Sequence, residues 1–477
     1  MSPMQPTLFT TQWIQSVLGS STSTAPGPTL ASAAGFSSIT TDSRKISGGE
    51  LFVAIAGETF DGHSFIEKAL ASGAAGVLAD ASKLTPQKIS ELARLHPKAL
   101  FYTVPDVLEA YRALGHAWRM RFKIPVIVVA GSNGKTTTKE ILAAMLRGRH
   151  ASLLRTAGSQ NGFLGIPMTL LELRPDHGAA VIEVGIDDVG AMARHIECVR
   201  PTHAVLTVIG PEHLENLKDV ATVAREELIA LEHTLKLGGS VAIHLDDPWI
   251  AAWAEKAGKL PAGSATFSLE KPATLAARTS PSGLGVTHGD RTFTLAPPLP
   301  GRHNLQNLLA ATAVALLAGL KPSEIVSGLA LFEGAEGRSQ VRELPPSRQV
   351  ICDYYNASPV SMKAAFELLR STGPGNARRW ACLADMKELG ENELAFHREL
   401  AKPLLATGPA GILLHGPRMK SLLEELKKLG FQGILEHFET PEALAAHLKP
   451  RLGTDDVILL KGSRSMKMEK AWEALRS

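Results

Sequence analysis

The stretch VIVVAGSNGKTTTKE, Val126 to Glu140, decides the fold of the middle of this chain. An apolar strand pattern ends at Ala130, Gly131 and Gly134 follow, and a helical pattern begins near Thr136. The backbone amides of such a loop, the helix N-terminus and the Lys135 ammonium together form a site for an anion. The Thr136 hydroxyl is placed to ligate magnesium. The order of strand, Gly-Lys-Thr and helix predicts a phosphate-binding loop rather than an ordinary turn.

The loop is shorter than the usual phosphate-binding pattern, which places four residues between its first Gly and the Gly-Lys pair. Here Gly131 is followed by only two residues before that pair, and Val129 stands where the pattern has its first Gly. The residues that we expect to bind a nucleotide are Gly131, Ser132, Asn133, Gly134, Lys135, Thr136 and Thr137.

The composition sets broad limits. A chain of 477 residues is long enough for about three domains of ~150 residues. The 44% hydrophobic and 20% charged content predicts a soluble globular protein, and a net charge of +3 gives no support for nucleic-acid binding. The three cysteines are far apart without CxxC spacing, which favours a reducing cytoplasm and no zinc site. We expect no membrane span, since no apolar run approaches ~18 residues.

The chain is predicted to have three segments, 1–123, 124–335 and 336–477. The middle segment has apolar strands near 179–185, 203–210 and 240–247 that alternate with helices, a pattern typical of a parallel sheet covered on both faces. The third segment repeats this alternation and is predicted to be Rossmann-like. The first segment also contains strand and helix patterns. The predicted fold class is therefore α/β in three domains.

Two further side chains in the middle segment are candidate metal ligands. Glu183 lies inside an apolar strand, where a carboxylate is costly unless it is paired or bound to a metal. His213 follows the next strand, so it could face the same edge of the sheet, where ligands bind in parallel α/β folds. A solvated His is the alternative.

Several stretches resemble the Mur ligases of peptidoglycan synthesis. They are GSNGKTT, VIEVG, EHLE and GRHNLQN in the middle segment, TDSRKISGGELFVAIAGETFDGHSFI in the first, and CDYYNASPVSMKAA, LADMKELG and LLKGSRSMKME in the third. The resemblance covers nearly the whole chain in order. Within the family, it is strongest to the ligases that join D-alanyl-D-alanine to UDP-N-acetylmuramoyl-tripeptide.

The resemblance implies an ATP- and Mg²⁺-dependent ligase of cytoplasmic cell-wall biogenesis, and hence of cell shape and division. It implies an acyl-phosphate intermediate, with Lys135, Glu183, His213 and Arg338 as catalytic groups and Asn304, Asn307, Arg338 and Asp353 around the nucleotide. Thr136, Glu183 and His213 would hold magnesium. The implied partners are the two small-molecule substrates, and the chain is expected to be a monomer without nucleic acid.

For the substrates, the resemblance indicates Ser43, Arg44, Asp61 and His63 in the first segment as the uridine and pyrophosphate site. The alternatives are a turn at Asp42-Ser43-Arg44 and a helix N-terminus capped by Ser64. The candidate contacts for the remaining substrate groups are Asn161, Asn356, Ser361, Asp385 and Arg464. Burial or capping is an equal alternative for the last four.

The chain departs from the family pattern in several places. GNxNN becomes GSQNG, ELGANH becomes EVGIDD, and DDSYNAN becomes CDYYNAS. Glu227 stands where the family usually has a carbamylated lysine that binds a second magnesium. A Glu supplies the same oxygen ligand but is ~3–4 Å shorter. We therefore expect Glu227 to have a metal-linked role that requires no bicarbonate; a solvated residue beside Arg225 and Glu226 is the alternative.

The sequence leaves other functions as alternatives. A related ligase for a diamino acid would carry a DNPR stretch, which this sequence lacks. A glutamate-adding ligase, a folylpolyglutamate synthase and a non-catalytic nucleotide-binding relative are further alternatives, and the missing lysine supports only the last.

Overall fold

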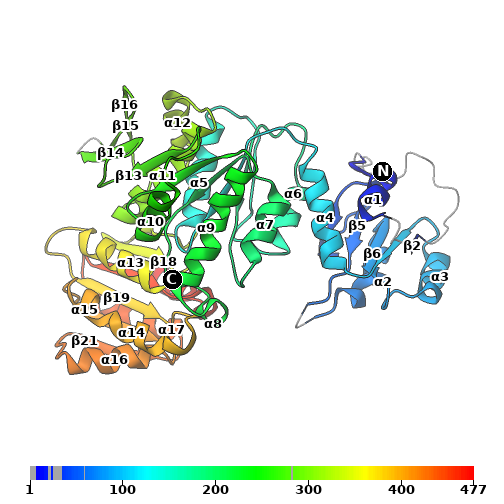
Figure 1. Cartoon of the computed structure of the whole chain (residues 1–477). Helices are drawn as coiled ribbons and strands as arrows, with labels where there is room; N and C mark the ends of the chain where they lie inside the picture. Colours follow the sequence, from blue (N-terminus) through cyan, green and yellow to red (C-terminus); the bar gives the residue numbers. More distant parts are fainter. Residues whose placement is uncertain (1–6, 20–22, 25–34, 58–59, 281–282) are drawn as a thin grey trace. The chain divides into compact units, whose positions relative to one another are not determined.

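The structure is a computed structural model that describes residues 7–19, 23–24, 35–57, 60–280 and 283–477 (Figure 1). The chain divides into two compact units. The first contains residues 1–124, 154–182 and 194–200, and the second contains residues 125–153, 183–193 and 201–477. The division into three segments stays a prediction.

The first unit is built on a five-stranded sheet in the order β2-β7-β6-β5-β4, in which β4 to β7 are parallel and β2 is antiparallel to β7. Phe52, Val77 and Phe101 on this sheet pack with Ile66 and Leu70 in one apolar core. The elements of the first unit are β1 (Phe9–Thr10), α1 (Thr11–Leu18), β2 (Ser23–Thr24), β3 (Gly35–Phe36), β4 (Ile39–Thr40), β5 (Leu51–Val53), α2 (Ile66–Ala71), β6 (Gly76–Asp80), α3 (Pro86–Leu95), β7 (Leu100–Val104), α4 (Val107–Arg119), β9 (Leu154–Arg155) and α6 (Gly165–Leu171).

Helix α4 places three basic side chains at spacing i, i+4 and i+7, namely Arg112, His116 and Arg119. They contact carbonyl groups of α7 (Ala191–Val199) and of Arg200 directly after it; the carbonyls of residues 198 to 200 lie at the C-terminal end, where the helix offers no partner. The carbonyl oxygens lie 2.9–3.2 Å from these side chains and belong to residues 194, 198, 199 and 200. The basic residues therefore cap a helix end, which explains their burial.

The second unit contains a sheet in the order β16-β15-β14-β13-β12-β11-β8. Strands β8 to β14 in this order are parallel, and β14, β15 and β16 form an antiparallel extension. Its strands are β8 (Val126–Ala130), β11 (His203–Leu206), β12 (Ser240–His244), β13 (Ala265–Ser268), β14 (Leu275–Ser280), β15 (Gly283–His288) and β16 (Arg291–Leu295). Glu183 ends β10 (Ala180–Glu183), and the next backbone amide, of Val184, donates to Val129 O.

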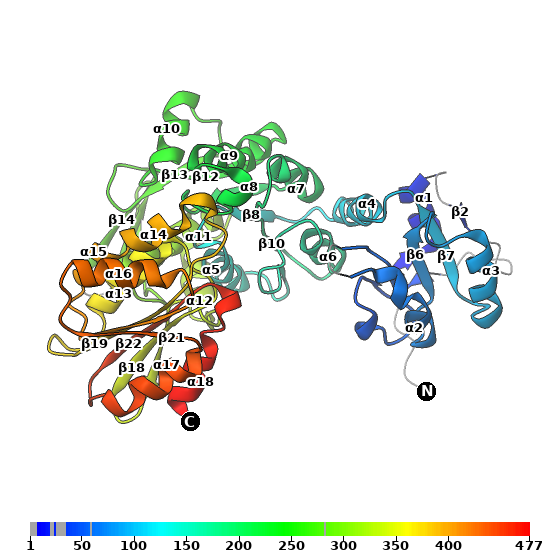
Figure 2. The same cartoon turned by 90° about the horizontal axis from the view of Figure 1, so that it is seen from below.

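Helices cover this sheet on both faces, as the apolar strands predict (Figure 2). α5 (Lys135–Arg147), α11 (Arg302–Leu317) and α12 (Pro322–Leu329) pack together, whereas α9 (Val220–Lys236) and α10 (Pro248–Ala257) pack together and on β12. Ala130 pairs with Leu206, so β8 and β11 end at the same level. The loops that follow them therefore meet at one edge of the sheet.

The C-terminal part of the second unit has a six-stranded sheet in the order β17-β18-β22-β19-β20-β21, parallel except for β17. Its strands are β17 (Gln340–Leu344), β18 (Arg348–Asp353), β19 (Arg379–Ala384), β20 (Gly411–His415), β21 (Ile434–Phe438) and β22 (Val457–Lys461). One apolar core lies under α13 (Pro359–Ser371), α14 (Glu393–Glu399), α15 (Ala401–Leu405) and α16 (Met419–Lys428), and the other under α17 (Pro441–Leu448) and α18 (Glu469–Arg476). The predicted α/β fold class with parallel sheets is confirmed.

Among the helices of the described residues, none has the length and apolar character needed to cross a membrane.

Candidate nucleotide and metal site

The loop between β8 and α5 depends on both of its glycines. Gly131 has φ +114° and Gly134 has φ +85°, values that favour glycine. A Cβ on Gly131 would lie 2.4 Å from Thr207 Oγ1, and one on Gly134 would lie 2.3 Å from Asn307 Oδ1. The shortened loop is therefore held close to α11 and to Thr207, which directly follows β11.

The segment after β11 fixes the loop from the other side. Ser132 N donates to Val208 O at 2.7 Å, and Ser132 Oγ donates to Gly210 O at 3.0 Å. Thr207 Oγ1 donates to Asn133 O at 2.5 Å. The loop backbone is thus anchored before any ligand binds, which lowers the entropy lost on binding.

Lys135 is the first residue of α5, and its ammonium turns back onto the loop. Its Nζ donates to Gly131 O at 2.6 Å and to Glu212 Oε2 at 3.2 Å. Burial lowers the pKa of Lys135, but the carboxylates of Glu212, Glu227 and Glu183 outweigh burial and raise it overall. The lysine is therefore charged at neutral pH.

Glu227 of α9 is fully buried, so the alternative of a solvated residue is wrong. Its Oε2 accepts a hydrogen bond from Gly131 N at 2.8 Å. The Glu227 side chain, although shorter than a carbamylated lysine, thus binds the loop backbone directly. Burial raises the pKa of Glu227 well above its usual value, and the Glu212 carboxyl raises it further.

Glu183 is 1% exposed at the end of β10 and is paired, as its burial requires. The partner is Lys139, one turn after Lys135 on α5, whose Nζ lies 3.4 Å from Glu183 Oε2 and 3.2 Å from Glu140 Oε1. The position of Glu183 at the strand end is as predicted, and its role as a metal ligand stays a prediction.

His213 precedes α8 (Leu214–Leu217) in a left-handed conformation, φ 47°. Its Nδ1 lies 2.7 Å from Glu388 Oε2 in the LADMKELG stretch, and Leu214 N donates to Glu388 O at 3.0 Å. The hydrogen bond to Glu388 raises the pKa of His213. In the neutral ring, Nδ1–H donates to Glu388 and Nε2 is left to bind a metal, so the contact with Glu388 is compatible with the proposed metal role.

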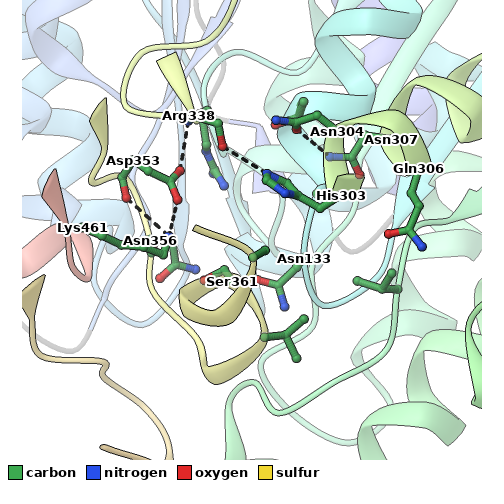
Figure 3. A pocket seen from close by; sticks show the side chains of 16 residues that line it. Asn133, His303, Asn304, Gln306, Asn307, Arg338, Asp353, Asn356, Ser361 and Lys461 are labelled. Carbon is green, nitrogen blue, oxygen red and sulfur yellow. Dashed lines mark hydrogen bonds and ion pairs between the residues drawn. The ribbon is translucent and has the colours of Figure 1, made fainter. Parts of the chain in front are cut away.

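A pocket beside the loop collects many of the predicted nucleotide-binding residues (Figure 3). Asp353, Asn356 and Lys461 lie on one side of the view, and His303, Asn304 and Asn307 lie on the other. The predicted residues that line the pocket are Asn133, Gly134, Thr137, Asn304, Asn307, Arg338, Asp353, Asn356 and Ser361.

Arg338 and Asp353 join the C-terminal part to the loop. Arg338 donates to Thr136 Oγ1 at 2.9 Å, and its guanidinium lies 4.3 Å from the centre of the Tyr355 ring. Asp353 pairs with the buried Lys461 at 2.6 Å, and although burial raises the pKa of Asp353, Lys461 lowers it overall. The pocket thus combines a cation, a carboxylate and amides.

Models of one family match most of the chain. The Mur ligase middle domain matches residues 129–315, the glutamate ligase domain residues 337–464, and the Mur ligase catalytic domain residues 36–118. A UDP-N-acetylmuramoyl-tripeptide–D-alanyl-D-alanine ligase of Synechocystis sp. is 32% identical over 437 residues, which are 90% of this chain and 89% of that protein. The chain belongs to the Mur ligase family.

Other relatives support the same family assignment. The Mur ligase of the same name from Escherichia coli is 33% identical over 451 residues, 92% of this chain and 93% of that protein. A crystal structure of MurF from Acinetobacter baumannii superimposes with a TM-score of 0.81 at 28% identity and covers 98% of both chains. The resemblance predicted from the sequence is confirmed.

Some site residues of this Mur ligase escaped the sequence analysis. Glu212, which precedes His213, binds Lys135, and Lys139 pairs with Glu183. Lys461 pairs with Asp353, and Glu388 binds His213. Only Glu212 carried a sequence signal, because it follows a strand end directly beside a candidate ligand.

The four candidates in the third segment have structural partners. Asn356 Oδ1 accepts from Ala357 N at 2.8 Å, and Ser361 forms a capping box with Ser358 at the start of α13. Asp385 is fully buried and accepts from Met419 N at 3.0 Å at the start of α16. Arg464 lies outside the pocket lining and pairs with Glu469 at 3.3 Å. Their substrate roles stay predictions.

The uridine candidates lie in the first unit. Ser43 and Arg44 form a turn in which the 82% exposed Arg44 binds Asp42 through two nitrogens. Asp61, rather than Ser64, caps the helical turn after it, and Asp61 also binds His63 Nδ1 at 2.6 Å. Asn161 is half-buried in the same unit. Substrate binding by these residues stays a prediction.

The described residues contain no group of three or more His, Cys, Asp or Glu side chains arranged to hold a metal ion. One buried oxygen of Glu227 nevertheless has no hydrogen-bond partner among the residues described. This oxygen is the feature of the site that best fits a hard cation such as Mg²⁺.

Proposed function

We propose that this Mur ligase joins D-alanyl-D-alanine to UDP-N-acetylmuramoyl-tripeptide in an ATP-dependent reaction of peptidoglycan precursor synthesis. The observation that carries the proposal is the match to relatives of that name over about nine-tenths of both chains. The phosphate-binding loop with Lys135, the contact of Arg338 with Thr136 and the adjoining pocket supply groups that this chemistry needs.

In the proposed reaction, the terminal carboxylate oxygen of the tripeptide attacks the γ-phosphorus of ATP. The bond to the bridging oxygen breaks, ADP leaves, and an acyl phosphate forms. The amine of the dipeptide then attacks the acyl carbon, inorganic phosphate leaves, and the amine loses a proton. ATP provides the leaving group, so no further co-reactant is needed.

Negative charge on the transferring phosphoryl oxygens is what the protein has to stabilise. Lys135 contacts the loop backbone and Arg338 contacts the loop's threonine hydroxyl, so these two cations are the groups proposed for this role. Asn304 and Asn307, buried on α11 behind Gly134, would face the adenine. Asp353 would complete the pocket.

The proposed magnesium ligands are Thr136, Glu183, His213 and Glu227. Magnesium bound there would offset the charge of the phosphates. Glu227 fits because its second oxygen is buried without a hydrogen-bond partner among the described residues. The same proposal places the uridine and pyrophosphate at Ser43, Arg44, Asp61 and His63, with the enzyme acting as a cytoplasmic monomer.

The test is release of phosphate from γ-labelled ATP by the purified chain, with each substrate supplied alone and together. We expect release that requires both UDP-N-acetylmuramoyl-tripeptide and D-alanyl-D-alanine, and a product whose mass is the sum of the two minus water. A requirement for a single diamino acid or glutamate instead of the dipeptide would replace this function by that of another Mur ligase. Nucleotide binding without turnover would indicate a non-catalytic relative.

A further inference from the structure

Glu212 and Glu227 meet at the peptide of Gly131. Glu227 accepts the hydrogen bond of Gly131 N at 2.8 Å. Lys135 donates to Gly131 O at 2.6 Å, and the same ammonium lies 3.2 Å from Glu212 Oε2. Glu227 lies on α9, and Glu212 lies in the loop after β11. Glu227 binds the backbone of Gly131 directly, whereas Glu212 binds Lys135, which in turn binds Gly131 O.

Each of these side chains has one buried oxygen to which no N–H group of the described residues donates. These atoms are Glu212 Oε1 and Glu227 Oε1. The Glu227 residue is 0% exposed and the Glu212 side chain 10%. Leaving a buried carboxylate oxygen unpaired is costly, so such an atom is suited to bind a proton, a water or a cation.

Glu212 and Glu227 also contact each other, because a hydrogen bond between their side chains contributes to the raised pKa of Glu227. Two carboxyl groups this close share either a proton or a cation. Glu183 has Lys139 as a separate cation. A divalent cation would take the place of the shared proton, and Mg²⁺ is commonly bound by one or two carboxylates together with substrate phosphates.

We propose that Glu212 and Glu227 form a paired-carboxylate seat for a second divalent cation, with Glu212 as the ligand that the sequence did not reveal. The proposal rests on the proposed nucleotide site, since phosphate oxygens would complete the shell. The cation would replace the Lys135 ammonium as the partner of Glu212. Lys135 would then be free to turn from Gly131 O toward the phosphates.

The test is a titration of Mn²⁺ followed by electron paramagnetic resonance, with the full chain and a non-hydrolysable ATP analogue. We expect two bound Mn²⁺ per chain in the natural protein. Glu212→Gln, which keeps an oxygen acceptor for Lys135, should weaken the second Mn²⁺ at least tenfold. The matched control is Glu215→Gln, an exposed residue on α8, which should bind both ions normally.

Either of two results would contradict the proposed cation site. In one, the natural chain binds a single Mn²⁺; in the other, the Glu212→Gln variant binds two Mn²⁺ ions with unchanged affinity. The second would mean that Glu212 acts only through Lys135. Circular dichroism shows whether each variant is folded. If Glu212→Gln is unfolded, the affinity of Glu212→Asp for the second Mn²⁺ is measured instead. Normal binding of two ions without ligation of the proposed substrates would refute the proposed function and leave the seat intact.

Discussion

Lys135 illustrates how one residue depends on neighbours that are remote in sequence. The loop motif predicts an ammonium that points at phosphates, but here the ammonium is 13% exposed and bound to Gly131 O and Glu212. Removal of the Lys135 side chain therefore has two effects. The phosphates lose a cationic partner, and the buried Glu212 carboxylate is left unpaired.

We predict that Lys135→Ala lowers the ligation rate by about a thousandfold or more, since it removes a cation that acts on the transition state. The unfolding temperature should fall by a few degrees because Glu212 loses its partner. Steady-state phosphate release and thermal unfolding measure the two effects. Lys236→Ala, an exposed change at the end of α9, is the control. Turnover within tenfold of the natural enzyme would contradict the role of Lys135.

Glu227 carries a second prediction at this scale. A glutamate needs no bicarbonate to become a carboxylate ligand, so ligation should be unaffected when bicarbonate is removed or added. Glu227→Gln should lose activity that additional Mg²⁺ partly restores. Assays across a range of Mg²⁺ concentrations, with Glu255→Gln on α10 as control, decide this. A normal Mg²⁺ dependence in Glu227→Gln would exclude the metal role.

At the scale of elements, the helix of the phosphate-binding loop is fixed by close packing at its far end. Gly148 follows α5, and Gly328 lies in α12. A Cβ on Gly328 would lie 2.4 Å from Met145 O and 2.5 Å from Ala144 O. These are backbone atoms, which cannot move aside separately, so α12 holds the whole of α5.

We predict that Gly328→Ala destabilises the second unit by about 1–3 kcal/mol, the usual cost of excess volume in a packed interface. Gly375→Ala is the matched control, because a Cβ there meets no atom within 4 Å. Denaturant unfolding of both variants provides the comparison. Equal midpoints for the two would show that α5 and α12 separate without cost.

A buried histidine of α7, packed near α4, makes stability depend on pH. His195 is fully buried, packs 4.5 Å from the Phe163 ring and lies near Arg112 and Arg194. Its two nitrogens have no hydrogen-bond partner among the described residues. Burial, and then the two arginines, lower the pKa of His195 to about 3.

The unfolded chain binds a proton at His195 below pH ~6.5, whereas the folded chain does so only near pH 3. Stability is therefore present above pH ~6.5 and falls as the pH falls toward 3, by about 2 kcal/mol between pH 7 and 5 for this group. We predict that His195→Leu loses this dependence. Urea unfolding at pH 7 and 5 tests it, with His96→Leu at the end of α3 as control; the same acid sensitivity in His195→Leu would contradict it.

At the scale of the whole molecule, the candidate residues for the two nucleotides belong to different compact units. Ser43, Arg44, Asp61 and His63 are in the first unit, whereas the loop and its pocket are in the second. Within the second unit, the middle and C-terminal parts are connected through Arg338 with Thr136 and through Ser358 with Asn133. Substitutions in the first unit should therefore change KM for the UDP-linked substrate, whereas substitutions in the second unit should change KM for ATP.

We predict that Arg44→Ala raises KM for UDP-N-acetylmuramoyl-tripeptide about tenfold, the effect of losing one charge-assisted hydrogen bond to a phosphate. KM for ATP should change less than twofold. Arg94→Ala, an exposed arginine on α3 of the same unit, controls for net charge. An increase confined to the KM for ATP would place Arg44 at the other nucleotide.

The sequence by itself determined the α/β class, the strands and helices around the loop, and the family. These follow from local physics, since a turn that exposes amides needs glycine and a buried parallel strand needs an unbroken apolar run. Helix boundaries follow less directly from the sequence: one continuous helical pattern at 393–405 forms two helices, α14 and α15, which meet at Leu400.

Only the tertiary structure decided which side chains become partners. The contacts of Glu212 with Lys135, Glu183 with Lys139 and Glu388 with His213 join residues that are 77, 44 and 175 positions apart, and no local pattern specifies such pairs. The burial of Glu227 was likewise invisible, because a run of charged residues on a helix resembles a solvated face until the position of the sheet is known. Local propensity depends on a few neighbouring residues, whereas burial and charge pairing depend on how distant strand ends converge at one edge of the sheet.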